Sequence, residues 1–237
     1  MIVIVCQLCL QLLVVQAPRI PVNGSFSEVF SVFQNPARLV SLQHVTAGLY
    51  TERRFMLREL SMHALALGMP LAGGVMGVKL WQLGYRYYRE QLFGLGYALP
   101  LGKRLRAAAG FNYRRGGVGG ELGVDWLLTP QLNMGVHLYH PGSDDAASMV
   151  MLGYKASEQV MMEAAFRKDV SMPLSVRVQC TYWPVKRFLV LGGWATQPVY
   201  QYAGIGYGVE KWRIGVTGSF HHTLGITPGI SLVWGKE

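Results

Sequence analysis

A repeating rhythm of apolar and polar residues dominates the chain. From about residue 44 to the end, segments of about ten residues alternate in polarity and then break at a turn. In one such segment the apolar members are Trp212, Ile214, Val216 and Phe220. A period of two residues predicts a β-strand with two different faces. One face is aromatic and branched, whereas the other carries charged, amide and glycine residues that suit a dry core poorly. The rhythm therefore predicts a transmembrane β-barrel that is apolar outside and polar inside.

The same rhythm predicts the number of strands and their connections. Fourteen segments are expected, near residues 44–51, 58–67, 74–82, 90–99, 103–113, 120–128, 131–139, 147–155, 158–167, 174–182, 186–195, 200–208, 211–220 and 227–235. Tight turns alternate with longer connections along the chain. Outer-membrane barrels show the same asymmetry, with short turns at the periplasmic end and longer loops at the extracellular end. An even strand number brings both chain ends to the short-turn side, where the last strand is expected to close against the first. The predicted fold is an all-β, antiparallel, up-and-down transmembrane barrel.

A soluble β-sandwich or a lipocalin-like barrel is the alternative, because alternation alone does not distinguish inside from outside. Three observations favour the membrane. The strand number is high, and charged residues make up 15% of the chain, against the usual quarter in soluble domains. Aromatic residues lie near predicted strand ends, like the interfacial girdles of membrane barrels: Tyr113, Trp126, Trp194 and Trp212. We therefore predict that the protein lies in the cell outer membrane, in contact with its lipid.

The charge and cysteine content limit the partners and cofactors of the chain. The net charge of +9 favours either a basic lumen with basic loop ends near anionic lipid, or a basic docking surface for an acidic partner. The arginines are spread through the strand pattern and form no single stripe, so nucleic-acid binding is not expected. With Cys6 and Cys9 removed in a leader peptide, Cys180 stands alone, and no metal-ligand spacing is present. No disulfide, metal or cofactor is expected.

The first 43 residues do not alternate, and they divide into two parts. Residues 1–17 form an apolar run that resembles a secretory signal peptide; a transmembrane anchor is the alternative, although the run is short for one. Within residues 18–43, Ser25–Phe33 is expected to form a short amphipathic helix with Ser25 and Glu28 as a capping box. Pro36 forces Asn35 out of helical geometry, which predicts a turn over 35–39. We expect this segment, around Asn35, Pro36, Ala37 and Arg38, to plug the barrel of residues 44–237.

An Asn-Pro-Ala turn in front of a fourteen-stranded barrel resembles the FadL-like superfamily of outer-membrane proteins. Within that superfamily the chain is more similar to the PorV/PorQ-type proteins associated with type IX secretion. The stretches that carry the resemblance are Phe30–Leu39, Gly48–Leu60 and His221–Leu232.

The resemblance implies an outer-membrane barrel whose N-terminal segment lies in the lumen. It also implies a non-enzymatic partner in protein secretion or surface attachment, which contacts secretion-machinery subunits or secreted cargo. Two other functions stay open at this point. One is a FadL-like passive channel for small hydrophobic molecules, and the other is a lipid-modifying enzyme of the outer membrane.

Several polar residues invite a catalytic interpretation. Ser219, His221 and His222 lie together at a strand end, but Ser219 shares its parity with Thr217 and is expected to face the lumen rather than lipid. His63, with Ser61 and Glu59, is expected to join a polar network in the lumen. The glycine-rich run 114–120 lacks the setting of a phosphate loop and predicts a flexible external loop. No catalytic residues are expected.

Charged residues with inward parity form the most suggestive set. The basic members are Arg104, Arg106, Arg167, Arg177 and Arg213, and the acidic members are Glu121, Asp125 and Glu163. Pairing between the two groups predicts a plugged, structural interior. Unpaired arginines predict an anion-selective pore instead. The sequence leaves both alternatives open.

Overall fold

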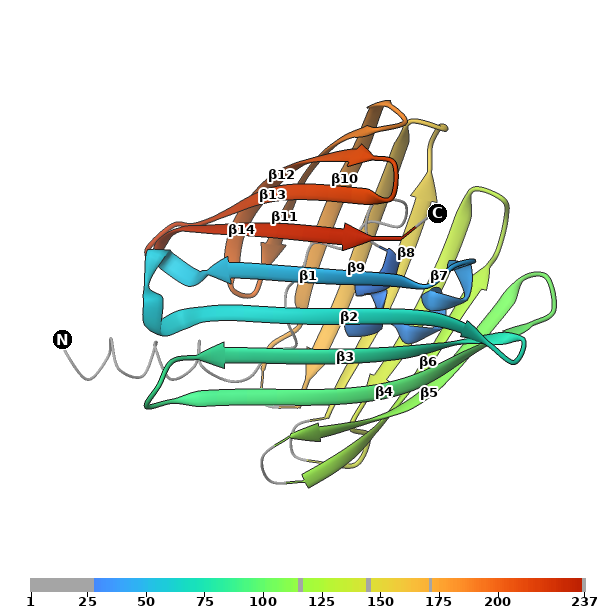
Figure 1. Cartoon of the computed structure of the whole chain (residues 1–237), viewed down its shortest axis with the longest axis horizontal. Helices are drawn as coiled ribbons and strands as arrows, with labels where there is room; N and C mark the ends of the chain where they lie inside the picture. Colours follow the sequence, from blue (N-terminus) through green and yellow to red (C-terminus); the bar gives the residue numbers. More distant parts are fainter. Residues whose placement is uncertain (1–27, 115–116, 144–145, 171, 236–237) are drawn as a thin grey trace.

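A computed structural model describes residues 28–114, 117–143, 146–170 and 172–235 of the chain. None of the helices in these ranges has the length and apolarity needed to cross a bilayer. The strands form one closed antiparallel barrel (Figure 1). They are β1 (Thr46–Arg53), β2 (Ser61–Leu71), β3 (Gly74–Gly84), β4 (Arg89–Leu101), β5 (Leu105–Arg114), β6 (Gly117–Leu127), β7 (Leu132–Tyr139), β8 (Ala147–Lys155), β9 (Val160–Asp169), β10 (Ser175–Val185), β11 (Phe188–Thr196), β12 (Val199–Val209), β13 (Trp212–His221) and β14 (Gly225–Trp234).

The topology confirms the predicted fold. Each strand pairs with its neighbours in sequence, and β1 pairs with β14 to close the barrel, with Leu49 opposite Leu232. All fourteen predicted segments overlap the observed strands, with ends that differ by a few residues.

The direction of the side chains shows that the barrel is apolar outside. In β12 and β13 the apolar residues Ile205, Tyr207, Ile214 and Val216 are each about half exposed. Polar side chains on the other face are buried, among them Lys79, Asn112, Glu121 and Gln179. A soluble barrel has the opposite arrangement, because it turns its apolar face inward. This exterior needs a hydrocarbon surround, as in a transmembrane barrel.

The connections define two ends of the barrel. At the turn end, β2 and β3 are joined by residues 72–73 alone. The first strand, β1, begins at this end, and the last strand, β14, ends there. At the loop end, β1 and β2 are joined by residues 54–60, which form two short 3-10 helices, η3 (Arg54–Met56) and η4 (Arg58–Leu60).

The loop predicted over the glycine-rich run is largely strand. Gly119 and Gly120 pair with Asn112 and Phe111 in the β5–β6 ladder, and the hydrogen-bonded ladder satisfies their backbone groups. A Cβ on Gly119 would lie 2.2 Å from the ring of His140, which stacks on Tyr139 at 3.9 Å. Glycine is needed here for close packing rather than for a flexible loop.

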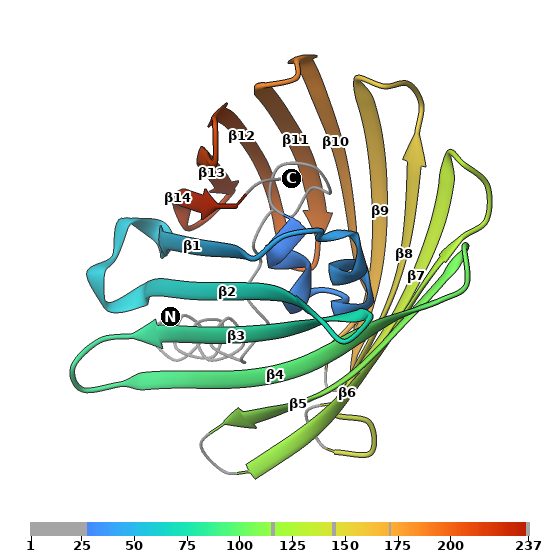
Figure 2. The same ribbon diagram turned by 45° about the vertical axis from the view of Figure 1, so that its right-hand side comes forward.

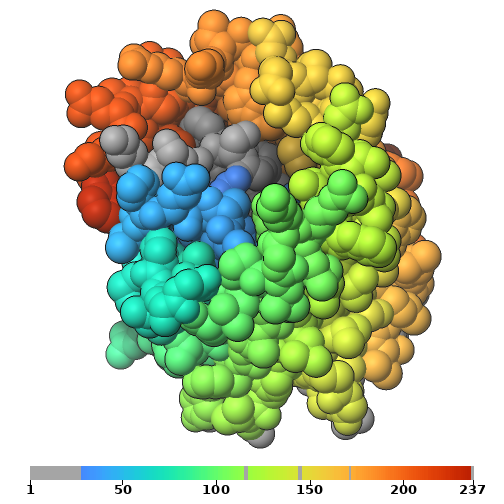
Figure 3. Space-filling view, turned by 90° about the vertical axis from the view of Figure 1, so that its right-hand side faces the viewer, coloured from blue at the N-terminus to red at the C-terminus, as the bar shows by residue number. Residues whose placement is uncertain are grey.

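Residues 28–42, which precede β1, lie inside the barrel (Figure 2). They form two 3-10 helices, η1 (Glu28–Phe33) and η2 (Pro36–Ser41). Figure 3 looks onto the turn end, where this segment is seen in the mouth of the barrel. We call residues 28–42 the plug. The expected helix over 25–33 is a 3-10 helix in its described part, and Ser25 with its capping box, like the predicted signal peptide, lies outside the described residues. The expected turn over 35–39 is extended into η2.

Candidate functional site

Asn35 fixes the plug to the barrel wall. Its side chain is fully buried and caps η2, because Oδ1 accepts a hydrogen bond from the Ala37 N–H at 3.1 Å. Nδ2 donates to the carbonyl oxygen of Val124 on β6 at 2.8 Å. Pro36 follows at the first helical position, where its missing N–H costs nothing. The Asn-Pro-Ala sequence thus both starts a helix and attaches it to the wall.

Inward-facing glycines leave room for the plug on this side of the barrel. A Cβ on Gly48 would lie 2.7 Å from the ring of Phe30, and one on Gly77 would lie 2.4 Å from Leu39. A Cβ on Gly123 would lie 2.4 Å from Asn35 Oδ1. Real Cβ atoms do not approach other atoms this closely, so the wall and the plug are shaped to each other.

A buried ionic cluster lies between the plug and the wall. Lys79 of β3 donates from Nζ to both carboxylate oxygens of Glu121 on β6, at 2.8 and 2.7 Å. It also donates to the carbonyl oxygen of Val32 in η1 at 3.2 Å. His137 of β7 approaches Glu121 from the other side, with Nε2 at 3.2 Å from Oε2. The side chains of Lys79 and Glu121 are 2% and 0% exposed, so each charge depends on the other for compensation.

A second ion pair links the plug to the opposite wall. Arg38 of η2 donates to Glu163 of β9 at 2.9 Å, and the two side chains are 12% and 6% exposed. The negative charge of Glu163 raises the pKa of Arg38 above its ordinary value. The plug therefore packs on β1–β7 and reaches β9 through one charged side chain.

The remaining predicted lumen charges have different surroundings. Arg106 lies 3.6 Å from Asp125, which also accepts a hydrogen bond from Asn133 at 3.3 Å. Arg167 pairs with Asp169 at 2.6 Å. Arg213 is buried and donates to the carbonyl oxygen of Gly235 at 3.2 Å.

Two of the predicted arginines lie outside these pairs. Arg177 of β10 is partly buried and has no ion-pair partner within the described ranges. Arg104 was predicted to face the lumen, but it lies in the β4–β5 turn and is exposed. The reason is that β5 begins one residue later, at Leu105.

Sequence reasoning did not select Lys79 or Asp169 as site residues. Lys79 shares its parity with Gly77 and Trp81, so its inward direction was available from the alternation. Its pairing with Glu121 could not be predicted from the alternation, because the two residues lie on strands separated by β4 and β5. The curvature of the closed barrel and the plug bring them together.

The prediction for His63 was wrong in its direction. His63 lies on the outer face of β2, where Nδ1 is 3.0 Å from the Thr51 hydroxyl. Its polar character predicted the lumen, but within β2 His63 shares its parity with Leu65 and Leu67, whereas the buried, inward-facing residues are Met62, Ala64 and Ala66. Ser61 and His63 share a face, and that face is the outer one.

A cavity lies beside the plug, next to Arg38 and Asp125. It has a volume of about 480 Å³ and opens at the turn end. Arg38 and Ser41 line it from the plug, and Asp125, Met161 and Trp183 line it from the wall. Its volume is within the range of ligand pockets, about 300–1,000 Å³.

At the end of β13, His221 stabilises the backbone of the turn that follows it. Nδ1 of His221 accepts hydrogen bonds from the backbone N–H groups of Thr223 and Leu224, both at 3.2 Å. Ser219 faces inward and His222 is exposed.

We predict that the S219A/H221A/H222A variant and the wild type release fatty acid from phospholipid micelles at the same background rate. A lower rate in the variant would assign a catalytic role to these residues.

The fold and the lumen define the class of this protein: it is a transmembrane β-barrel of the outer-membrane type, with its N-terminal segment seated in the lumen. An apolar exterior of this kind places it in the outer membrane.

Comparison with known proteins gives the fold relatives of this barrel. No family model matches the chain, and no curated protein matches it. Among solved structures it is similar to the CymD monoaromatic hydrocarbon channel, with a TM-score of 0.68 and 12% identity over 91% of this chain and 95% of that one. It is also similar to the toluene transporter TbuX of Ralstonia pickettii, with a TM-score of 0.65 and 11% identity over 88% and 94%. The toluene transporter TodX of P. putida gives a TM-score of 0.61 at 11% identity over the same shares. At these identities the likeness establishes a shared fold.

Proposed function

We propose that the protein is a passive, non-enzymatic outer-membrane channel of the FadL-like type, which admits small hydrophobic molecules. The observation that carries this proposal is the plugged lumen with a cavity beside the plug, in a barrel similar in fold to three proteins described as hydrocarbon or toluene channels and transporters. A plug that fills one side of the lumen narrows the route through the barrel. A cavity along its other side leaves space for a small molecule.

The contacts of the plug suggest the route. Its apolar side chains, among them Phe30 and Leu39, pack on β1–β3, whereas the cavity lies between η2 and the turn ends of β6–β10. Arg38 and its partner Glu163 stand at the boundary of the two regions. We infer that small molecules pass along the cavity side, and that the Arg38–Glu163 pair limits the width of this passage.

A role as a secretion partner is the second candidate, and it rests on the resemblance to PorV/PorQ-type proteins. The loop-end connections that the structure describes in full are short, the longest being residues 54–60. They offer a small external surface for a protein partner. The channel is therefore the function that the geometry favours.

Toluene uptake by whole Gram-negative cells tests the channel. Whole cells are needed because toluene crosses a plain phospholipid bilayer unaided. Cells that express the protein are expected to take up labelled toluene several times faster than cells with an empty vector. The R38A variant is expected to be faster still, since it removes the ion pair that links the plug to Glu163 of β9.

The control is a polar solute of similar size, whose uptake is expected to stay at the empty-vector level. Toluene uptake equal to the empty vector, together with copurification of secretion subunits in mild detergent, would replace the channel with the secretion role.

A further inference from the structure

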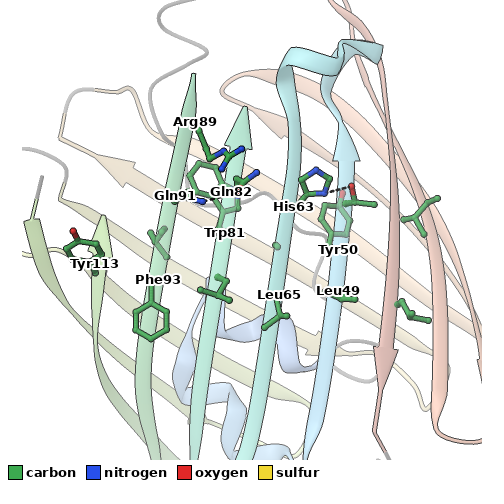
Figure 4. Close-up of a pocket in the computed structure, with 16 residues that line it drawn as sticks. Leu49, Tyr50, His63, Leu65, Trp81, Gln82, Arg89, Gln91, Phe93 and Tyr113 are labelled. Atoms are coloured by element: carbon green, nitrogen blue, oxygen red, sulfur yellow. Dashed lines mark hydrogen bonds between the residues drawn. The ribbon is translucent and has the colours of Figure 1, made fainter. Parts of the chain in front are cut away.

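The outer wall of the barrel carries a groove that the passage through the lumen does not use. It has a volume of about 950 Å³ and crosses the outer face of β1–β5, with Ile230 and Leu232 of β14 at one edge. Figure 4 shows the groove, with Leu65 and Phe93 in its lower part and His63, Gln82 and Arg89 above them. The side chains of Leu80 and Phe93 are about two-fifths exposed and point away from the lumen. In a membrane this groove faces lipid.

The strand register arranges the groove residues in layers. Leu49, Leu65, Leu80 and Phe93 lie opposite one another in successive strands and form an apolar row. One step nearer the loop end, the outward residues are polar and also lie in one row: Thr51, His63, Gln82 and Gln91. The members of this row are joined in pairs, Thr51 to His63 and Gln82 to Gln91, both at 3.0 Å.

The polar row ends at β1, on the side of the seam with β14. Following the ladder from Thr51 away from the groove, the opposite residues are Ile230, Val216 and Ile205. All three are apolar and exposed to lipid. The row of hydrogen-bonding groups on the outer face of β1–β4 therefore does not continue along this ladder into β14, β13 and β12.

Cations stand directly above the polar row, at the loop end. Arg53 ends β1 and Arg89 begins β4, and Arg58 and Arg86 lie in the connections beside them; all four are exposed. Within the described ranges, none of the four has a carboxylate partner. Of the nearby acids, Glu52 is engaged by Arg54 and Tyr50, and Glu90 by Tyr88, which leaves only Glu59 exposed. The loop end above the groove thus has an excess of positive charge.

These layers match the layers of an anionic lipid. Guanidinium groups bind phosphate, amide and hydroxyl groups bind ester and amide linkages, and the apolar row accommodates acyl chains. From Arg53 to Arg89 the row spans about 14 Å, three strand spacings of about 4.8 Å, which suits a headgroup with two separated phosphates. Longer loops mark the extracellular end of such barrels, so the facing leaflet is the outer one.

We propose that this groove is a binding site for lipopolysaccharide, the phosphorylated multi-chain glycolipid of that leaflet. Its lipid A phosphates bind the loop-end arginines, and its acyl chains lie over Leu65, Leu80 and Phe93. The site is independent of the proposed channel function, because the arginines and the polar and apolar rows that form it lie on the outer face of the barrel.

The test compares two variants that each lose three exposed cations. R53Q/R86Q/R89Q removes charge above the groove, and K103Q/R104Q/R187Q removes the same charge at the turn end, where all three residues are exposed. Purified, folded protein in mild detergent is titrated with fluorescent lipid A. The loop-end variant is expected to bind at least tenfold more weakly than the wild type, and the turn-end variant to bind like the wild type. Heat-modifiable migration on a gel checks that both variants are folded.

A second variant tests the apolar part of the groove without changing the charge. L65W fills the groove and is expected to weaken lipid A binding, while a phospholipid, phosphatidylglycerol, is expected to bind the wild type weakly. Equal binding by both charge variants would overturn the proposal, because net charge alone would then explain it. Equal affinity for phosphatidylglycerol, or a dimer crosslinked through groove residues, would assign the groove to a different occupant and also overturn it.

Discussion

Replacing Glu121 with Ala is expected to lower the free energy of unfolding of the barrel by about 3–5 kcal/mol, because it leaves the buried Lys79 without a counter-charge. Lys79 is 2% exposed and donates to both carboxylate oxygens of Glu121. The substitution also removes the acceptor beside His137. The measurement is the urea dependence of folding in detergent micelles, followed by tryptophan fluorescence and by heat-modifiable migration.

Two further variants separate a buried charge from a general loss of packing. The K79M/E121L double variant removes both charges and is expected to recover most of the stability, since apolar replacements of a buried ion pair are often neutral or stabilising. The E158A variant breaks the exposed pair with Lys155, whose side chains are 47% and 91% exposed, and is expected to cost less than about 1 kcal/mol. If E121A is no less stable than E158A, water compensates Lys79 and the cluster does not hold the wall together.

Replacing Gly123 with Val is expected to displace the plug from β6. A Cβ at this position would lie 2.4 Å from Asn35 Oδ1 and 3.3 Å from Pro36. Overpacking of this kind costs about 1–3 kcal/mol, which raises the population of a displaced plug by about five- to 150-fold. The readout is the rate at which a maleimide labels a cysteine placed at Ala37, which is fully buried, in a chain whose three native cysteines are replaced by serine.

The matched control is Gly218→Val on β13. This glycine faces outward, and an added Cβ would meet nothing within 4 Å, so the labelling rate at position 37 is expected to stay at its original value. If Gly123→Val and Gly218→Val label at the same rate, the segment around Asn35 does not rest on β6, and the passage beside it has another shape.

Much of the barrel was predictable because strand alternation is a local property. A segment such as β13 shows its two faces in ten residues. That the apolar face is the outer one followed from the strand number, the low charge and the aromatic residues near strand ends. The errors have two causes. His63 was assigned to the lumen because it is polar, although it shares its face of β2 with Leu65 and Leu67. Arg104 lies one residue before its strand begins.

The candidate site was less predictable because its contacts are long-range. Asn35 and Pro36 were expected in a plug, since the Asn-Pro pair is a local turn signal. Their attachment to Val124, and the pairing of Arg38 with Glu163, depend on which wall the segment rests against. The alternation indicates which residues face inward, but it does not indicate which of them meet across a closed lumen. Lys79 and Glu121 meet because β3 and β6 curve around the same plug.

The position of the plug in the chain has a consequence for biogenesis. Residues 28–42 precede β1, and β1 is one side of the β1–β14 seam. The strands on which the plug packs, β1–β7, come first in the chain. They do not include β14, which forms the other side of that seam. We therefore expect β1–β7 to fold around residues 28–42 before the β1–β14 seam closes, so that the plug also serves as a template for assembly of the barrel.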